Sequence, residues 1–377
     1  MTLPARQIIA AGKKALRQMA DRDTPFIFND WYVAALSDEV SRTLTKRTLL
    51  GKRVVFYRTE DGRAVALEDR CAHRSFPLSS GTLEGDTVVC GYHGFRYDAE
   101  GNWCDVPSQA KCPRGIGVRN YTLIERGPLI WIWMGDETPD EGKFPHQDWI
   151  DSPQWAWSSG YMPMKGSYVG LHENLIDLTH LSYVHAKSFG TPDYARAAFK
   201  AEIEESAFSV VRHVVPTRLP LLWAKATQLE NTSTAARIVR SSFISPALHL
   251  TSVDFYESTL PEQGRPEFHI RVAHLPTPET AGSMHYFVVI GRDFGIDQPE
   301  LQDFIHEQLC AAFREDKEAL ELVDDVLKDR DDAFFEVSVA NDAAAVAMRR
   351  YLKSRADHEH PSGPGVPVTP ALRSVAG

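Results

Sequence analysis

The sequence has few cysteines, five in 377 residues, and an odd number of thiols does not suit the disulfide framework of a secreted protein. It also lacks a long hydrophobic run, because the longest, near Leu129–Met134, is far too short to span a bilayer. The N-terminal region shows neither a sustained apolar core nor a cleavage pattern, so we expect a surface helix there and no signal peptide. These features favour a protein of the reducing cytoplasm that does not act within a membrane.

Basic charge is also in short supply. Lys and Arg number 41 against 51 Asp and Glu, which gives a formal net charge of −10. No basic tract stands out in the body of the chain, and this argues against nucleic acid as the main ligand. The composition is otherwise that of a globular protein, and the length favours two domains or one large one.

Two regions of different texture follow one another along the chain. Residues 26–136 contain short strand-like runs separated by turn signals such as Glu60-Asp61-Gly62, which predict a small antiparallel sandwich or barrel. The acidic, proline-bearing stretch Gly135–Pro145 is the predicted boundary. Residues 145–357 combine strand-like runs with helices predicted at Leu171–Lys187, Leu301 to about Leu327 and Asp342–Arg355. We therefore expect an α+β protein, with an all-β domain followed by an antiparallel sheet flanked by helices.

The ends of the chain are expected to lie outside these two domains. Residues 1–25 are predicted to form an N-terminal helix or arm. Residues 358–377 contain four prolines and are predicted to be a loosely packed tail.

A pair of Cys/His motifs is the strongest local signal. Cys71 and His73 are followed, after sixteen intervening residues, by Cys90 and His93. Such a set could be a zinc site, a Rieske [2Fe–2S] cluster in which two Cys hold one iron and two His the other, or four unconnected core residues. Coincidence is a weak explanation for two tight pairs. Each segment supplies one Cys and one His, which suits a dinuclear cluster held by two loops, but these residue types alone leave zinc open.

A second polar cluster lies in the predicted helix at Leu171–Lys187. Asn174, Asp177 and His180 are spaced by three residues and share one helical face. His185 lies five residues beyond His180, well off that face, so the helix must end or bulge between them if both bind one metal. A lone His is more often structural, but two His beside an Asp and an Asn favour a metal.

A third ligand is available in the helix beginning at Leu301. Its apolar stripe comprises Ile305, Leu309, Ala312, Phe313, Leu320, Val323 and Leu327, and Asp316 falls in the middle of it. An unpaired carboxylate pointing into the core is very unfavourable, and a bound cation would satisfy it. The alternatives are an ion pair of Asp316 with Arg349 or Arg350, or a different ligand such as Asp324 or Asp325. Glu315, Lys317 and Glu318 fall off the stripe and are expected to be solvated.

The sequence around the first set of residues resembles the cluster-binding loops of Rieske domains. The matching segments are Cys71-Ala72-His73-Arg74 and Cys90-Gly91-Tyr92-His93-Gly94-Phe95, followed by Tyr97-Asp98, Gly101-Asn102 and Pro107. Respiratory Rieske proteins carry an extra Cys in each loop, where this chain has Phe76 and Gly91. The resemblance is therefore to the Rieske domains of oxygenases and their ferredoxins, and it implies a lower reduction potential. Cys104, Cys112 and Cys310 are expected to be incidental reduced thiols.

The second polar cluster resembles the N-x-x-D-x-x-H-x₄-H signature of the catalytic domain of Rieske non-haem iron oxygenases. This resemblance implies that His180, His185 and a later carboxylate bind one Fe(II), and Phe313–Lys317 looks like the third-ligand helix of the vanillate O-demethylase branch. It further implies a helix-grip catalytic domain and a homotrimer, in which Asp177 lies between His93 of one chain and His180 of the next. We expect Asn174 beside the iron ligands and His274 as a hydrogen-bonding partner of the substrate, whereas His285 is expected to be structural and His172 has no assigned role.

The resemblance implies a terminal oxygenase of a multicomponent Rieske monooxygenase. NAD(P)H would supply electrons through a reductase with flavin and a plant-type [2Fe–2S] cluster, or through a ferredoxin. With O₂, the enzyme would hydroxylate a C–H bond next to O or N of an aromatic substrate, and O- or N-dealkylation would release an aldehyde. The alternatives are a ring-hydroxylating (di)oxygenase acting on an aromatic acid and a Rieske electron carrier without catalysis. The sequence does not identify the substrate.

Overall fold

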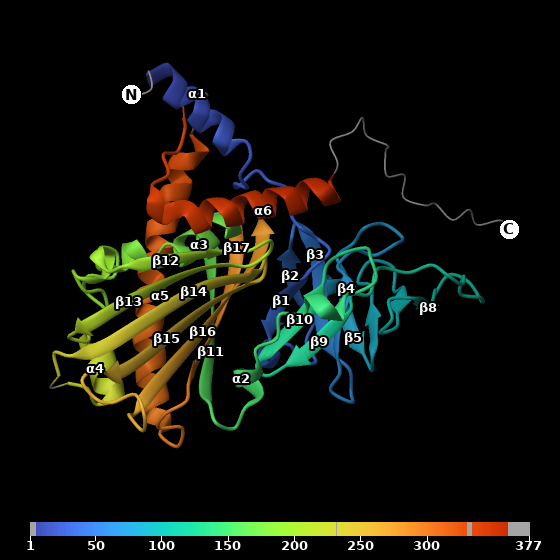
Figure 1. Cartoon of the computed structure of the whole chain (residues 1–377). Helices are drawn as coiled ribbons and strands as arrows, with labels where there is room; N and C mark the ends of the chain where they lie inside the picture. Colours follow the sequence, from blue (N-terminus) through green and yellow to red (C-terminus); the bar gives the residue numbers. More distant parts are fainter. Residues whose placement is uncertain (1–4, 231, 330–333, 361–377) are drawn as a thin grey trace.

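The computed structural model describes residues 5–230, 232–329 and 334–360. It contains a small β-rich body and a larger sheet with helices, shown side by side in Figure 1. The predicted tail falls partly outside these residues: helix α6 (Ala343–Glu359) continues to Glu359, and residues 361–377 are not described. Within the described residues, no helix is long and apolar enough to cross a membrane.

The N-terminal body consists of three small sheets. Their strand orders are β1-β10-β9, β2-β3-β4 and β5-β6-β7-β8, and every pairing is antiparallel. The strands are β1 (Trp31–Leu36), β2 (Thr45–Leu49), β3 (Lys52–Arg58), β4 (Ala64–Glu68), β5 (Thr82–Glu84), β6 (Thr87–Val89), β7 (Arg96–Tyr97), β8 (Trp103–Asp105), β9 (Leu123–Arg126) and β10 (Leu129–Trp133). This agrees with the expectation of a small antiparallel β domain.

The second body is built on one antiparallel sheet of seven strands, in the order β11-β17-β16-β15-β14-β13-β12. Their bounds are β11 (Ala156–Lys165), β12 (Phe199–Ile203), β13 (Phe208–Thr217), β14 (Ala235–Ser245), β15 (Leu248–Glu257), β16 (Glu267–Thr280) and β17 (Ser283–Arg292). The other helices are α1 (Ala5–Leu16), α2 (Asp148–Asp151), α3 (Tyr168–Ile176), α4 (Leu221–Thr227) and α5 (Pro299–Lys328). The α+β fold class is confirmed, with the β domain first and the helix-flanked sheet second.

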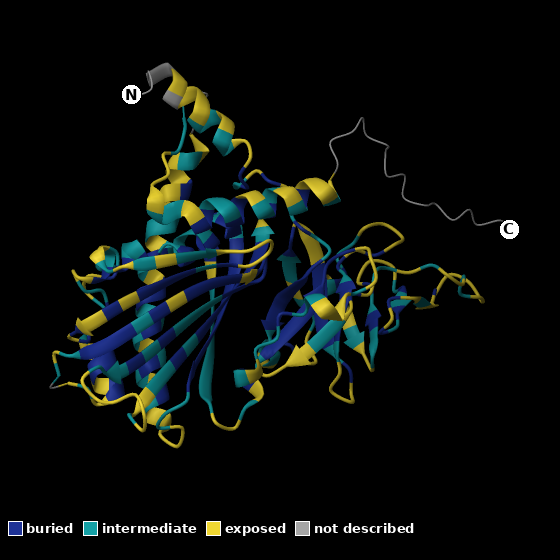
Figure 2. Cartoon of the chain, in the orientation of Figure 1, coloured by how far each residue is buried: buried dark blue, intermediate teal, exposed yellow. Residues whose placement is uncertain are grey.

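The helices cover one face of the sheet, and the N-terminal body covers part of the other face (Figure 2). Side chains alternate along a strand. In β17, Tyr286 and Val288 accordingly enter the core beneath the helices, whereas Phe287 and Val289 enter the core shared with β1 and β10. The Thr277 hydroxyl also donates to the Val33 carbonyl across this junction, at 2.7 Å.

Two helix predictions need correction. The predicted helix Leu171–Lys187 is interrupted: α3 ends at Ile176, Asp177 adopts an extended backbone, and a short 3₁₀ helix spans Leu178–Ser182. In α5 the buried stripe holds as far as Asp316, but Val323 is exposed and Asp324 is buried instead. The C-terminal part of α5 therefore does not bury the face that the sequence predicts.

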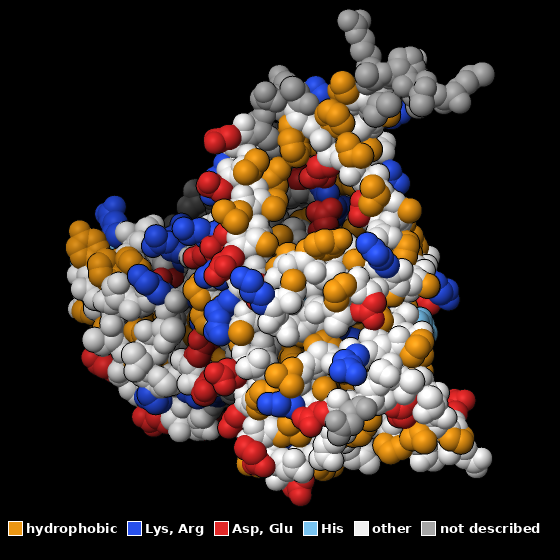
Figure 3. Space-filling model, turned by 90° about the vertical axis from the view of Figure 1, so that its left-hand side faces the viewer, with side chains coloured by type: hydrophobic (Ala, Val, Ile, Leu, Met, Phe, Trp, Pro, Cys, Tyr) orange, Lys and Arg blue, Asp and Glu red, His pale blue; other side chains and the backbone are white. Residues whose placement is uncertain are grey.

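On the face shown in Figure 3, Lys and Arg side chains are interspersed with Asp and Glu, and hydrophobic side chains lie between them. The described residues on this face form no continuous basic stripe.

Candidate metal centres

The Cys71 and Cys90 segments form two loops of matching backbone geometry. In each, the Cys N–H donates to the carbonyl five residues later, Phe76 or Phe95, at 2.8 Å. The N–H four residues after each Cys donates back to the Cys carbonyl at 2.9 Å. These donors belong to Ser75 and Gly94, which both have positive φ, 57° and 73°. The loops are therefore two copies of one turn that project from the β-rich body.

The four predicted donors of these loops come together. The rings of His73 and His93 lie 4.8 Å apart between centroids and are exposed, whereas Cys71 and Cys90 are buried. Burial raises the pKa of the Cys90 thiol, and its contact with the Cys71 thiol raises it further. Two buried thiols beside two exposed imidazoles match the donor set of a Rieske [2Fe–2S] cluster, which these four residues would hold.

Nearby groups complete this site. The Tyr97 hydroxyl donates to the Cys71 sulfur at 3.1 Å and accepts from the Ala72 N–H at 2.9 Å. All five cysteines are free. A Cβ at Gly91 would lie 2.9 Å from the Ser80 carbonyl oxygen and 3.3 Å from the Phe76 ring, so the space that an additional loop cysteine would need is occupied.

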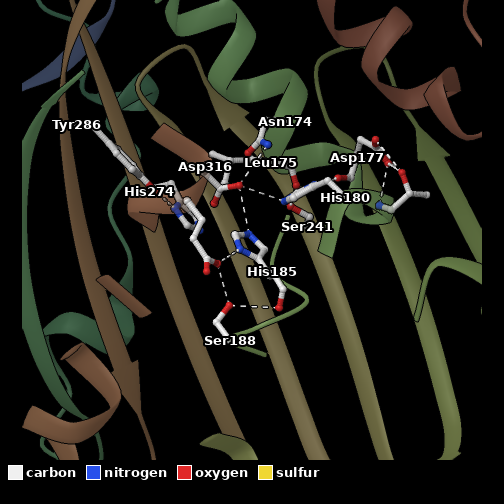
Figure 4. Close-up of polar contacts among 12 residues, drawn as sticks. Asn174, Leu175, Asp177, His180, His185, Ser188, Ser241, His274, Tyr286 and Asp316 are labelled. Carbon is white, nitrogen blue, oxygen red and sulfur yellow. Dashed lines mark hydrogen bonds and ion pairs between the residues drawn. The ribbon is translucent and has the colours of Figure 1, made fainter. Parts of the chain in front are cut away.

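The second centre forms where α3, the segment after it and α5 meet (Figure 4). The His180 and His185 Nε2 atoms lie 3.4 and 3.2 Å from Asp316 Oδ1. One ligand atom from each of the three residues lies within 4.8 Å of the others. The short 3₁₀ helix Leu178–Ser182 contains His180 and ends before His185, so the two residues do not share one continuous helix. The helical segment therefore ends between the two histidines, as their spacing requires if both bind one metal.

Hydrogen bonds at the far side of each ring orient the two histidines. His180 Nδ1 lies 2.5 Å from the Asp177 main-chain carbonyl, and His185 Nδ1 lies 2.7 Å from a Glu315 carboxylate oxygen. The Ser188 hydroxyl donates to the same Glu315 oxygen at 2.9 Å. Such contacts fix the ring tautomer so that Nε2 presents its lone pair to a metal. Two imidazoles and one carboxylate in this arrangement fit a non-haem Fe(II) site with open positions.

Asp316 has no arginine partner among the described residues. Burial alone would raise its pKa, but hydrogen bonds and charge from His180 and His185 hold the pKa well below its usual range. Asn174 donates to the same carboxylate at 3.3 Å, and its own carbonyl oxygen is buried without a hydrogen-bond partner. His180, His185 and Asp316 therefore form a compact, largely buried set of metal-binding side chains, and a bound cation would balance the charge of the Asp316 carboxylate.

Among the rival assignments, those to Arg349 and Asp324 are not supported. Arg349 pairs with Glu173 and Glu336 at 2.9 and 2.7 Å instead of with Asp316. Asp324 pairs with Arg22 at 2.8 Å, away from the two histidines.

One further expectation is corrected by a side-chain position. Glu315 is not merely solvated, because it accepts from His185. The Asp177 carboxylate accepts from the Thr179 N–H and hydroxyl at 2.9 and 2.6 Å, and the main-chain carbonyl of Asp177 contacts the His180 ring. Sequence reasoning missed Glu315 because the helical stripe places it beside the core and does not show what packs there.

A cavity with about 550 Å³ of empty volume opens beside the triad. Its lining is largely apolar: Leu175, Leu178, Leu181, Phe189, Trp223, Val239, Val253, Ile270, Val272, Leu309 and Phe313, with His180, His185, Asp316, His274, Thr251 and Arg237 as the polar members. His274 lies 2.5 Å from the Tyr286 hydroxyl through Nδ1, and burial lowers its pKa to about 3, so the ring is neutral. A largely apolar lining with a few polar groups suits a small aromatic molecule.

The remaining histidines lie outside this cavity. His172 and His249 form a buried pair, 3.4 Å between Nδ1 atoms, that ends on Ser241 and the Pro246 carbonyl. His285 contacts Tyr161 and the Thr48 carbonyl at the junction of the two bodies, which agrees with the structural role expected for it.

Comparison with known proteins gives two domain matches. The Rieske [2Fe-2S] domain matches residues 30–122, and the vanillate O-demethylase oxygenase C-terminal domain matches residues 164–358. The dicamba O-demethylase oxygenase component of Stenotrophomonas maltophilia is 34% identical over 303 residues, covering 79% of this chain and 88% of the relative.

Two further relatives and a solved structure are similar to this chain over most of its length. The putative toluene-4-sulfonate monooxygenase system iron-sulfur subunit TsaM2 of Comamonas testosteroni is 34% identical over 311 residues, with the same coverage, 79% and 88%. The chloroacetanilide N-alkylformylase oxygenase component of Rhizorhabdus wittichii is 29% identical and covers 87% of this chain and 95% of its own length. The crystal structure of dicamba monooxygenase bound to 3,6-dichlorosalicylic acid has a TM-score of 0.84 at 29% identity, covering 89% of this chain and 99% of that one.

Proposed function

Because the chain belongs to the vanillate O-demethylase branch of the Rieske non-haem iron oxygenases, we propose that it dealkylates a small aromatic ether or amine. The oxygenase hydroxylates the carbon attached to O or N, and the product collapses to a phenol or amine and an aldehyde. The observation that carries this proposal is the cavity beside the triad, since His180, His185 and Asp316 line it and a substrate bound there would face the residues that would hold the metal.

The side chains divide into two metal-binding sets. Cys71, Cys90, His73 and His93 would hold the [2Fe–2S] cluster, which supplies electrons one at a time. His180, His185 and Asp316 would hold the mononuclear iron, which supplies O₂ activation.

The chain's own groups prepare this site in three ways. Glu315 orients the His185 ring and the Asp177 carbonyl orients the His180 ring. Asn174 orients the Asp316 carboxylate by donating a hydrogen bond to it. The apolar wall of the cavity excludes water from the reacting carbon. Neutral His274 lines the cavity and offers a hydrogen bond to the substrate through its other ring nitrogen, because its Nδ1 is engaged by the Tyr286 hydroxyl.

The two centres lie far apart within one chain. Figure 1 shows the sheet β5–β8, beside the cluster loops, on the side of the molecule away from α5, and His73, His93 and Tyr92 are exposed there. This arrangement favours transfer from the cluster of one chain to the iron of its neighbour, in a homotrimer with Asp177 at the junction. A reductase or ferredoxin of the cytoplasm would reduce the cluster from NAD(P)H.

A substrate screen with the purified oxygenase, a reductase and NADH tests this function. Methoxylated and N-methylated aromatics are scored for O₂ uptake and aldehyde release. Dealkylation predicts one aldehyde for each O₂ consumed with a productive substrate. O₂ uptake that yields a ring diol without aldehyde would instead support ring hydroxylation.

A further inference from the structure

A buried arginine lines the cavity without a carboxylate partner. Arg237, on β14, is 2% exposed and belongs to the wall of the cavity beside the triad. Among the described residues it makes one hydrogen bond, from Nη1 to the Phe189 carbonyl at 3.1 Å, and no salt bridge. Its Nε is buried without an acceptor. A buried guanidinium with free donors is costly unless something in the working protein pairs with it.

The surroundings of Arg237 reduce this cost only in part. Its guanidinium carbon lies 4.9 and 5.6 Å from the ring centres of Tyr194 and Phe189. Burial lowers its pKa, and the charge of Asp193 acts against this from beyond ion-pair distance, while Asp193 itself accepts from Thr217. Aromatic faces attract a cation but accept no hydrogen bond of ordinary strength. The N–H groups of Arg237 therefore remain available.

Arg212 shows what a structural arginine looks like in the same sheet. It is 1% exposed, on the neighbouring strand β13, and its Nη1 donates to the carbonyls of Tyr194, Ala195 and Ala197. It does not belong to the cavity wall. The Nε of Arg212 is buried without an acceptor, like that of Arg237. The two arginines differ in that Arg212 donates to three main-chain carbonyls and Arg237 to one, and in that only Arg237 lines the cavity.

A second unpaired donor lies in the same wall. The Trp223 indole N–H is buried without a hydrogen-bond partner, and Trp223 also lines the cavity. Within the described residues, the orphaned side-chain polar atoms of the cavity-lining residues are these two, Arg237 Nε and Trp223 Nε1, and both are donors. Donors without acceptors favour a ligand that carries oxygen acceptors and negative charge.

The position of Arg237 relative to the triad sets the shape of such a ligand. The Phe189 ring lies 5.6 Å from the guanidinium carbon, and its centroid lies 4.8 Å from that of His185, which it stacks against. One aromatic ring therefore separates the cation from an iron-ligand side chain. A molecule whose anionic group meets Arg237 can place its opposite end at the triad.

We infer that Arg237 is the specificity-determining residue that binds an oxyanion head group, a carboxylate or sulfonate, of an aromatic substrate. The inference rests on the proposed function, since it assigns the substrate class of the same cavity. The reacting ether or amine is then on the far side of the substrate ring from the anion. Neutral His274 and the apolar walls contact the rest of the molecule.

Anaerobic titration calorimetry of the metal-loaded oxygenase tests this without turnover. The probes are 4-methoxybenzoate, its neutral isostere 4-methoxybenzamide, and toluene-4-sulfonate. We expect the parent to bind at least one of the two anions about 10- to 100-fold more tightly than the amide, as for charge-assisted hydrogen bonds. The ratio of the affinities for 4-methoxybenzoate and toluene-4-sulfonate shows which head group, carboxylate or sulfonate, is preferred. Equal binding of the anions and the amide by the parent would overturn the inference and needs no variant.

Two variants distinguish a role of Arg237 in ligand binding from a general effect on the fold. Arg237→Gln should lose the preference for the anion over the amide, while its affinity for the amide should stay within about twofold of the parent value. Arg212→Lys should keep the preference for the anion. An unchanged preference in Arg237→Gln, or an equal loss in Arg212→Lys, would contradict the assignment. Aldehyde release is measured separately, with the methoxylated and N-methylated aromatics of the substrate screen. If none of them is dealkylated while the anion preference depends on Arg237, the proposed function is wrong and the binding assignment holds.

Discussion

Loss of the Glu315 carboxylate should weaken iron binding without disturbing the cluster. Glu315 contacts His185 Nδ1 at 2.7 Å and accepts from Ser188, so it fixes the ring whose Nε2 faces Asp316. Outer partners of metal-bound histidines contribute roughly 10- to 100-fold to metal affinity, or about 1.4–2.7 kcal/mol. The Glu315 side chain is 31% exposed, which screens its charge, so we expect Glu315→Gln at the lower end of this range and Glu315→Ala at the upper end.

Chelator competition measures this effect, with the visible spectrum of the cluster as the internal control. Mononuclear iron is followed by recovery of activity as Fe(II) is added to the stripped protein. Glu318→Gln is the matched variant, because Glu318 is an exposed acid of the same helix and is expected to leave iron affinity unchanged. Parent-like iron affinity in Glu315→Ala would refute the reasoning that this carboxylate positions His185.

The other predictions concern the cluster, the junction and pH. Tyr97→Phe removes the hydrogen bond to the Cys71 sulfur and should make the cluster potential more negative in a redox titration, while Tyr92→Phe should not; equal potentials would contradict this. Asp177→Asn should fold and hold both metals, yet its pre-reduced cluster should not be oxidised in a single turnover with substrate and O₂; oxidation at the parent rate would make the residue merely structural. The hydrogen bond that the His269 ring donates to the Asp293 carboxylate raises the pKa of His269. This pair therefore stabilises the fold below the unfolded pKa of His269, and the stabilisation is lost as pH rises through the folded pKa. Asp293→Asn should therefore cost more unfolding free energy at about pH 5.5 than at about pH 9 in urea titrations, and a pH-independent cost would show that the charge of His269 plays no part.

The features that could be predicted from the sequence are local ones. The Cys/His spacings encode two short loops, so the cluster donors follow from the sequence directly. Asp316 was recognisable because a carboxylate in an apolar helical stripe has to point inward, and the structure buries it between His180 and His185.

The features that could not be predicted depend on packing between distant segments. The break after Ile176 arises from the extended backbone at Asp177, whose side chain caps the next short helix, and the spacing alone does not show it. Arg237 and Arg240 look alike as polar positions of one strand. Arg240 nevertheless pairs with Glu202 at 2.6 Å on the surface, while Arg237 faces the cavity, because their side chains lie on opposite faces of β14.

The central claim is that one chain carries a cluster that delivers electrons and an iron that uses them. Single turnover of the pre-reduced oxygenase, without reductase, tests it most directly. With a productive substrate and O₂, the account predicts that cluster oxidation and aldehyde release occur together in the parent. In Asp316→Ala both should be absent, although the cluster remains visible and reducible. Aldehyde release by Asp316→Ala at the parent rate would contradict the account.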